Sequence, residues 1–91
     1  MKVTVEISMY PFNESYRPLI GNFIEQLNTF NDLKITTSDT STMVVGEYLH
    51  VMKTLTEMFA WSYKTHGKAV FVTKIIPGYD PADYTDTHAE S

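Results

Sequence analysis

The sequence predicts an α+β domain whose elements follow the order βαββαβ. Two observations support this fold class: polar and apolar residues alternate in four short segments, and apolar residues recur at helical spacing in two longer ones. The chain has 91 residues, the size of one domain. We expect the domain to span residues 1–76, with an acidic tail over residues 77–91.

The first strand is predicted over residues 2–9. Its odd-numbered positions are apolar and its even-numbered positions are mostly polar, as in a strand covered on one face. After the break at residues 10–13, Ser15 can cap a helix whose first turn tolerates Pro18. This helix is expected to run to about Asn31–Asp32. Its apolar stripe consists of Leu19, Ile20, Phe23, Ile24 and Leu27.

Residues 33–38 and 41–46 are predicted to form a hairpin, because both segments suit strands and Asp39–Thr40 suits a turn. A second helix is expected from Glu47 to His66, where Gly67 favours a C-terminal stop. The last strand is predicted over residues 68–76. This order matches a ferredoxin-like fold, with a four-stranded antiparallel sheet and two helices on one face.

The last predicted strand is apolar on both of its faces. Because a half-covered strand needs only one apolar face, a further surface should cover the second face or the edge. We therefore expect a homodimer or homotetramer. The tail is expected either to be solvated or to lie across a partner subunit.

Composition narrows the function classes. Hydrophobic residues make up 43% of the chain and no apolar run is long enough to span a membrane, while the N-terminal segment does not have the pattern of a signal peptide. A cytoplasmic protein with no membrane partner is expected. Four of the acidic residues follow the last basic residue, Lys74, so that the body of the chain is neutral and nucleic-acid binding is not expected.

The sequence offers little for catalysis or metal binding. Cysteine is absent, and His50, His66 and His88 do not have metal-ligand spacing. No Gly-x-Ser-x-Gly motif and no glycine-rich phosphate loop occurs. We therefore expect no metal, no cofactor and no enzymatic activity.

A run of hydroxyl-bearing residues over 36–42 marks the predicted hairpin. Thr37 shares its face with Leu33 and Ile35, so its hydroxyl should point toward the helix-covered side, where an unpaired polar group is costly. A bound polar molecule would satisfy it, and Thr37, Ser38 and Thr42 are candidate binding residues. The alternative is that threonine suits strands and serine suits turns, with no ligand involved.

A second cluster depends on the expected topology. If the first and third strands are parallel central neighbours, their C-terminal ends meet, which brings Ser8, Met9 and Tyr10 close to Gly46, Glu47, Tyr48 and His50. A ring, a hydroxyl, a carboxylate and an imidazole would then form a small-molecule pocket. Alternatively, Glu47 is present because the helix dipole favours an acid there, and Tyr10 covers the sheet end.

Three segments carry a family resemblance: Ile7-Ser8-Met9-Tyr10-Pro11, the stretch from Ser41 to Glu47, and Leu49-His50-Val51-Met52. Over residues 3–76 the chain resembles the YkoF-like thiamine- and hydroxymethylpyrimidine-binding domains. The resemblance implies a ferredoxin-like domain that binds thiamine or its hydroxymethylpyrimidine moiety, without known catalysis, in vitamin uptake or salvage. Some members have two such domains, for which a homodimer would substitute here.

By position, the resemblance implies ligand contacts from Ser8, Tyr10, Thr42, Glu47 and His50. It leaves Glu6, Asp39 and Glu47 as the carboxylates that could face a thiazolium cation.

Two other function classes are compatible with the strand order. A dimeric α/β-barrel enzyme of the monooxygenase or isomerase type could use His50 or Tyr10 in acid–base chemistry. A regulatory interaction module could bind a protein partner through the open sheet face and the acidic tail.

Overall fold

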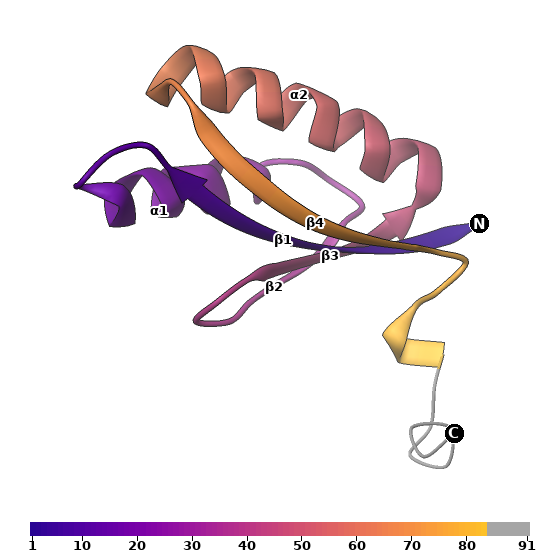
Figure 1. Ribbon diagram of the computed structural model, residues 1–91. Helices are drawn as coiled ribbons and strands as arrows, with labels where there is room; N and C mark the ends of the chain where they lie inside the picture. Colours follow the sequence, from indigo (N-terminus) through magenta and orange to yellow (C-terminus); the bar gives the residue numbers. More distant parts are fainter. Residues whose placement is uncertain (84–91) are drawn as a thin grey trace.

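A computed structural model describes residues 1–83, so the part of the predicted tail that contains Tyr84 and His88 lies outside the described residues. The elements follow the predicted order (Figure 1). They are β1 (Lys2–Pro11), α1 (Tyr16–Leu27), β2 (Lys34–Thr37), β3 (Thr42–Glu47), α2 (Tyr48–His66), β4 (Ala69–Pro77) and a short 3₁₀ turn (Pro81–Asp83).

The four strands form one sheet in the order β2-β3-β1-β4, and every neighbouring pair is antiparallel. Both helices lie on the same face of this sheet (Figure 1). The arrangement confirms the predicted ferredoxin-like α+β fold.

The predicted direction of β3 relative to β1 is wrong. β3 runs antiparallel to β1, with Lys2 opposite Glu47 and Ile7 opposite Thr42. The reason lies in the connections: the link through α1 returns the chain so that β2 runs parallel to β1, and the hairpin then reverses the direction again. The C-terminal ends of β1 and β3 therefore lie at opposite ends of the sheet.

The core lies between the sheet and the helices. The four odd-numbered apolar residues of β1 are buried, as their alternation predicts. They contact the inner stripes of both helices. The remaining buried members of the core are Phe23, Leu27, Val44, Val51, Leu55 and Met58. Phe71 of β4 closes the core between Phe23 and Phe59, at ring-centroid distances of 5.2 and 4.7 Å.

The helix ends differ in part from the prediction. α1 ends at Leu27, before the expected Asn31–Asp32, because Asn28 Nδ2 and Thr29 Oγ1 donate hydrogen bonds to the carbonyls of Ile24 and Gln26. Ser15 takes the N-cap position, but its side chain makes no capping hydrogen bond. α2 ends at the predicted site, where Gly67 adopts a φ of 82°.

The segment after β4 folds onto the face of the sheet that the helices leave open (Figure 1). The Gly78 amide donates to the carbonyl of Lys2 at 2.7 Å, and Thr4 Oγ1 donates to the carbonyl of Tyr79 at 2.7 Å. As a result Thr4, on the open face, is only 2% exposed. Within the described residues, no helix combines the length and the hydropathy that crossing a membrane would require.

Candidate functional site

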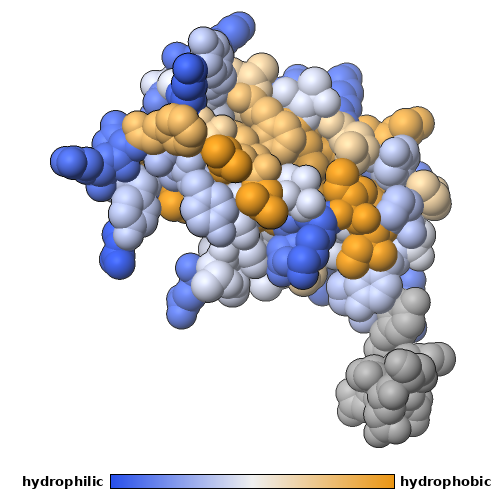
Figure 2. Space-filling model, viewed as in Figure 1, coloured by the Kyte–Doolittle hydropathy of each residue, from blue (hydrophilic) through white to orange (hydrophobic). Residues whose placement is uncertain are grey.

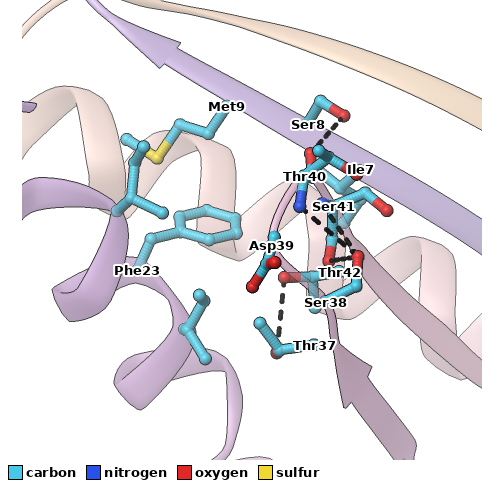
Figure 3. A pocket seen from close by; sticks show the side chains of 12 residues that line it. Ile7, Ser8, Met9, Phe23, Thr37, Ser38, Asp39, Thr40, Ser41 and Thr42 are labelled. Atoms are coloured by element: carbon cyan, nitrogen blue, oxygen red, sulfur yellow. Dashed lines mark hydrogen bonds between the residues drawn. The ribbon is translucent and has the colours of Figure 1, made fainter. Parts of the chain in front are cut away.

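A partly open hollow of about 80 Å³ lies between the tip of the β2–β3 hairpin, the middle of β1 and the inner face of α1. We call it the inner pocket. Its apolar side is made of Ile7, Met9, Ile20, Phe23 and Ile24. Its polar side is made of Ser8 and the hairpin residues 37–42. Figure 3 shows Met9 and Phe23 on one side and the hairpin hydroxyls on the other.

A wider, more open hollow of about 440 Å³ adjoins the inner pocket. We call it the outer groove. It is lined by the end of β1, including Tyr10 and Pro11, and by Tyr16 at the start of α1. Four residues line both hollows: Met9, Ile20, Asp39 and Thr40. The two hollows are therefore two compartments of one site: the first is smaller and bordered on one side by hydroxyls, and the second is wider and includes two tyrosines in its lining.

Hydrogen bonds hold the hairpin tip over the inner pocket. The Ser38 hydroxyl donates to the carbonyl of Ser41 at 3.2 Å and accepts from the amides of Thr40 and Ser41. Ser8 Oγ donates to the carbonyl of Thr40 at 3.1 Å, which ties the tip to β1. Ser8 and Ser38 thus both line the inner pocket, but their hydroxyls are already engaged in shaping it.

Thr37 and Thr42 face each other across the hairpin on the side of the sheet that carries the helices. Thr37 is exposed there, so the expected cost of an unpaired buried hydroxyl does not arise for it. The hydroxyl oxygens of Thr37 and Thr42 lie 3.5 Å apart, at the limit for a hydrogen bond. Thr42 is buried, with Ile7 opposite it on β1. Two hydroxyls that satisfy each other only weakly can turn to a ligand in the pocket at little cost.

Asp39 is the acidic group of the site. Its carboxylate extends from the hairpin toward the side on which Phe23 lies (Figure 3). Among residues 1–83, no side chain forms an ion pair with it. Glu6, in contrast, accepts a hydrogen bond from Ser41 Oγ and pairs with Lys74 at 3.4 Å. Asp39 is therefore the carboxylate that remains available to a cation.

Glu47 and His50 lie away from this site, contrary to the predicted cluster. Thr42 lines the pocket and Glu47 ends the same strand, so the two are separated by about 17 Å at about 3.3 Å a residue. The cluster with Ser8, Met9 and Tyr10 does not form because β1 and β3 are antiparallel. Gly46 and Tyr48, next to Glu47, lie at that far end too.

Both residues have structural partners where they lie. The N-terminal amino group donates to Glu47 Oε1 at 2.7 Å, and this hydrogen bond is the main reason that the pKa of Glu47 is lowered from 4.5. The His50 Nε2–H donates to the carbonyl of Asn31 at 2.7 Å, which fixes the loop before β2 against α2. Glu47 and His50 therefore do not share a site with Ser8 and Tyr10, with which ligand contacts were predicted.

The apolar side of the site was not predicted from the sequence. Ile20, Phe23 and Ile24 belong to the stripe that marked α1 as core-facing, and nothing in their spacing separates core from pocket lining. Tyr16 gave no signal either, since it lies just before the stripe. β2 ends at Thr37 and β3 begins at Thr42, so the residues between them that line the inner pocket belong to the hairpin turn and not to a strand.

The sequence matches no family model and no curated protein. Among solved structures, one from Thermotoga maritima, provisionally described as a thiamine biosynthesis/salvage protein, superposes with a TM-score of 0.76. It is 24% identical, and the alignment covers 98% of this chain and 95% of that one.

Two further structures have the same fold. A protein from Streptococcus pneumoniae has a TM-score of 0.79 at 19% identity, with both chains covered completely. A domain of unknown function from Bacillus cereus has a TM-score of 0.67 at 16% identity, over 96% of this chain and 93% of that one. At these identities the likeness shows the ferredoxin-like fold and no more.

Proposed function

We propose that the protein binds thiamine or its hydroxymethylpyrimidine moiety in the inner pocket and outer groove, without catalysis, as a cytoplasmic protein of vitamin uptake or salvage. The observation that carries the proposal is the junction of the two compartments, where an unpaired carboxylate, Asp39, borders both. The YkoF-like resemblance and the salvage description of the Thermotoga maritima structure point to the same ligand class.

The two compartments match a ligand made of two linked rings. At about 80 Å³ the inner pocket is well below the roughly 300–1,000 Å³ of sites for whole drug-sized ligands. It suits part of one small polar ring, such as an aminopyrimidine, whose nitrogens can exchange hydrogen bonds with Thr37 and Thr42. The outer groove, at about 440 Å³, has room for the second ring.

The second ring would lie against aromatic side chains. Tyr10, which is 57% exposed, and Tyr16 both line the outer groove. Aromatic faces attract cations, and Asp39 adds a full negative charge beside them. A thiazolium cation in the groove would thus be stabilised both by the aromatic faces and by the carboxylate of Asp39.

A binding role fits the groups that line the site better than acid–base catalysis does. They are hydroxyls, one carboxylate, and apolar or aromatic side chains. His50, one of the two residues that an isomerase-type mechanism could use, bonds to the carbonyl of Asn31 outside the site, while Tyr10, the other, lines the outer groove. We therefore propose a carrier or sensor, and not an enzyme.

Isothermal titration calorimetry with thiamine and with hydroxymethylpyrimidine tests the proposal. We expect Asp39→Asn to weaken thiamine binding about tenfold or more, because a charge-assisted contact contributes about 1.5–3 kcal/mol. The neutral pyrimidine should bind Asp39→Asn nearly as well as the parent protein. Glu47→Gln is the matched control, since it removes a carboxylate at the opposite end of the sheet.

Thermal unfolding provides the second readout, because a ligand at about 100 times its Kd stabilises the folded state by about 2.7 kcal/mol. The proposal would be refuted if both compounds, at millimolar concentrations, gave no heat of binding and no thermal stabilisation. A loss of thiamine binding in Glu47→Gln as large as in Asp39→Asn would also rule out this site.

A further inference from the structure

The tip of the β2–β3 hairpin, residues 38–41, lies beyond the paired part of both strands. The last pair of the hairpin joins Thr37 to Thr42, so the strand ladder stops before the tip. The bond that closes the tip is local: the Ser38 amide donates to the carbonyl of Ser41 at 2.9 Å. Figure 2, drawn in the view of Figure 1, shows hydrophilic and neutral surface at this end of the hairpin, toward the lower left. The position of the tip therefore depends mainly on polar contacts.

Two hydrogen bonds fasten the tip to β1, and we call them the latch. Ser8 Oγ donates to the carbonyl of Thr40 at 3.1 Å, and Ser41 Oγ donates to Glu6 Oε2 at 3.3 Å. Among residues 1–83, no other hydrogen bond joins the tip to a part of the chain outside the hairpin. Because water competes for such groups, each bond contributes only a small net free energy. The tip can therefore leave β1 at a modest cost.

The tip also separates the two hollows of the candidate site. Asp39 and Thr40 line both hollows, and so do Met9 of β1 and Ile20 of α1 on the opposite side. Figure 3 shows the residues of the tip across the inner pocket from Met9 and Phe23. Moving the tip away from β1 would thus join the inner pocket and the outer groove into one wider space.

A ligand needs this wider space to reach the inner end of the site. The inner pocket has about 80 Å³ and the outer groove about 440 Å³. A ring that comes from the outer groove and bonds to Thr37 and Thr42 has to pass between the tip and the side chains of Met9 and Ile20. The tip is the part of this passage that only the latch and the two hairpin strands hold.

We propose that residues 38–41 form a lid over the inner pocket, with Thr37 and Thr42 as its hinge and the latch as its closure. This inference rests on the proposed function, because it describes how the same ligand enters and leaves. In the structure the lid is closed, and it closes again over the bound ring. The latch is then present in both closed states, so a weaker latch should speed binding and release by the same factor and leave the Kd nearly unchanged.

Thiol labelling of the ligand-free protein tests the lid by itself. The chain has no cysteine, so Thr42→Cys places a single thiol in the wall of the inner pocket, at a position that is 6% exposed. Iodoacetamide should reach this thiol when the lid opens. We expect Ser8→Ala, which removes one bond of the latch, to raise the labelling rate about twofold to tenfold. Thr54→Cys, buried in α2, is the matched control, and Ser8→Ala should not change its labelling.

A reversible disulfide tests the role of the lid in ligand binding. The register that pairs Ile7 with Thr42 places Ser8 opposite Ser41 one step further along. Their Cα atoms would be about 4.5–5.5 Å apart, within disulfide range. We expect the double variant Ser8→Cys with Ser41→Cys to form this bond on oxidation. The oxidised form should bind hydroxymethylpyrimidine at least about tenfold more slowly than the reduced form, because the lid cannot open.

Stopped-flow tyrosine fluorescence measures these rates, since Tyr10 and Tyr16 line the adjoining groove. Comparing the oxidised and reduced forms of one variant cancels the loss of the two serine hydroxyls. The matched control is Thr36→Cys with Met43→Cys, a registered pair whose disulfide ties β2 to β3 and leaves the tip free from β1. Its oxidation should not change the binding rate.

The lid is overturned if Ser8→Ala leaves the labelling of Thr42→Cys unchanged, or speeds that of Thr54→Cys as much. It is also overturned if the cysteines at positions 8 and 41 do not form a disulfide, or if the oxidised form binds the pyrimidine as fast as the reduced form. A parent protein that binds neither thiamine nor the pyrimidine, while labelling follows the expectation, would refute the proposed function and support the lid.

Discussion

At the residue scale, Gly46 holds the loop before β2 close to the sheet. A Cβ at this position would lie 3.0 Å from Leu33 Cδ2, 3.1 Å from Val51 Cγ2 and 3.2 Å from the carbonyl oxygen of Asp32. A glycine within a strand marks either a close approach of neighbouring groups or a bulge, and at Gly46 the structure shows a close approach. Together with the bond from His50 to Asn31, it fixes the path by which the chain leaves α1.

We predict that Gly46→Ala destabilises the protein by about 1–3 kcal/mol, because the added methyl group meets backbone and packed side chains. Chemical denaturation measures this change. Gly21→Ala in α1 is the matched control: nothing lies within 4 Å of its Cβ, and alanine should stabilise the helix by about 0.5–1 kcal/mol. Equal effects of the two substitutions would contradict the packing role of Gly46.

Glu47 gives a prediction of pH dependence. Its folded-state pKa is lowered below 4.5, mainly by the hydrogen bond from the N-terminal amino group. The stabilisation is therefore present above the unfolded-state pKa and is lost as the pH falls through the lowered folded-state pKa. Glu47→Gln should reduce the free energy of unfolding at neutral pH and have no such effect at pH values well below 4.5.

Denaturation curves at a series of pH values and low ionic strength measure the difference between Glu47→Gln and the parent. Because both groups are exposed, added salt should shrink that difference. A difference that stays constant from neutral to strongly acidic pH would show that the ion pair does not cause it.

At the scale of elements, the segment that follows β4 is part of the folded structure rather than a simple continuation of the strand. A contact from Thr4 shows that the segment is folded against the sheet. Thr4 lies on the polar face of β1, and its hydroxyl donates a hydrogen bond to the carbonyl of Tyr79. Asp80 and Pro81 lie beside Met43 and Val45 on the same open face. Val45 is consequently only 7% exposed, although it faces away from the helices.

We predict that Thr4→Val, which keeps the shape and removes the hydroxyl, destabilises the protein by about 1 kcal/mol, the net value of one hydrogen bond. It should also speed hydrogen exchange at the Gly78 amide, which donates to Lys2 next to the lost bond. Thr65→Val, at an exposed threonine of α2 on the helix side, is the control and should leave that exchange rate unchanged. Exchange at Gly78 that is unaffected by Thr4→Val would show that Thr4 does not hold the segment.

The elements themselves were largely predictable, for local reasons. Alternation in β1 and the helical stripes of α1 and α2 depend on which face is buried, and the structure confirms them. The end of α1 was not predictable from the stripe, because side chains of Asn28 and Thr29 compete for the last carbonyls. Apolar periodicity contains no information about that competition.

At the scale of the whole molecule, small size explains why a second copy would matter. A domain of this length buries only about 60–65% of the surface that its unfolded chain exposes, so its margin of stability is modest. The exposed apolar residues of β4 make this margin smaller still, because in a single copy they contact water on both faces of the sheet.

The sequence by itself determined the element order, the buried face of each element and the hydroxyl-rich hairpin, because these follow from patterns between residues close in the chain. Only the tertiary structure decided that β1 and β3 are antiparallel. That direction separates Glu47 and His50 from Tyr10, whereas Asp39 lines the pocket. Chain direction depends on how connections reverse the backbone, and two segments distant in sequence become neighbours only when a shared core buries both.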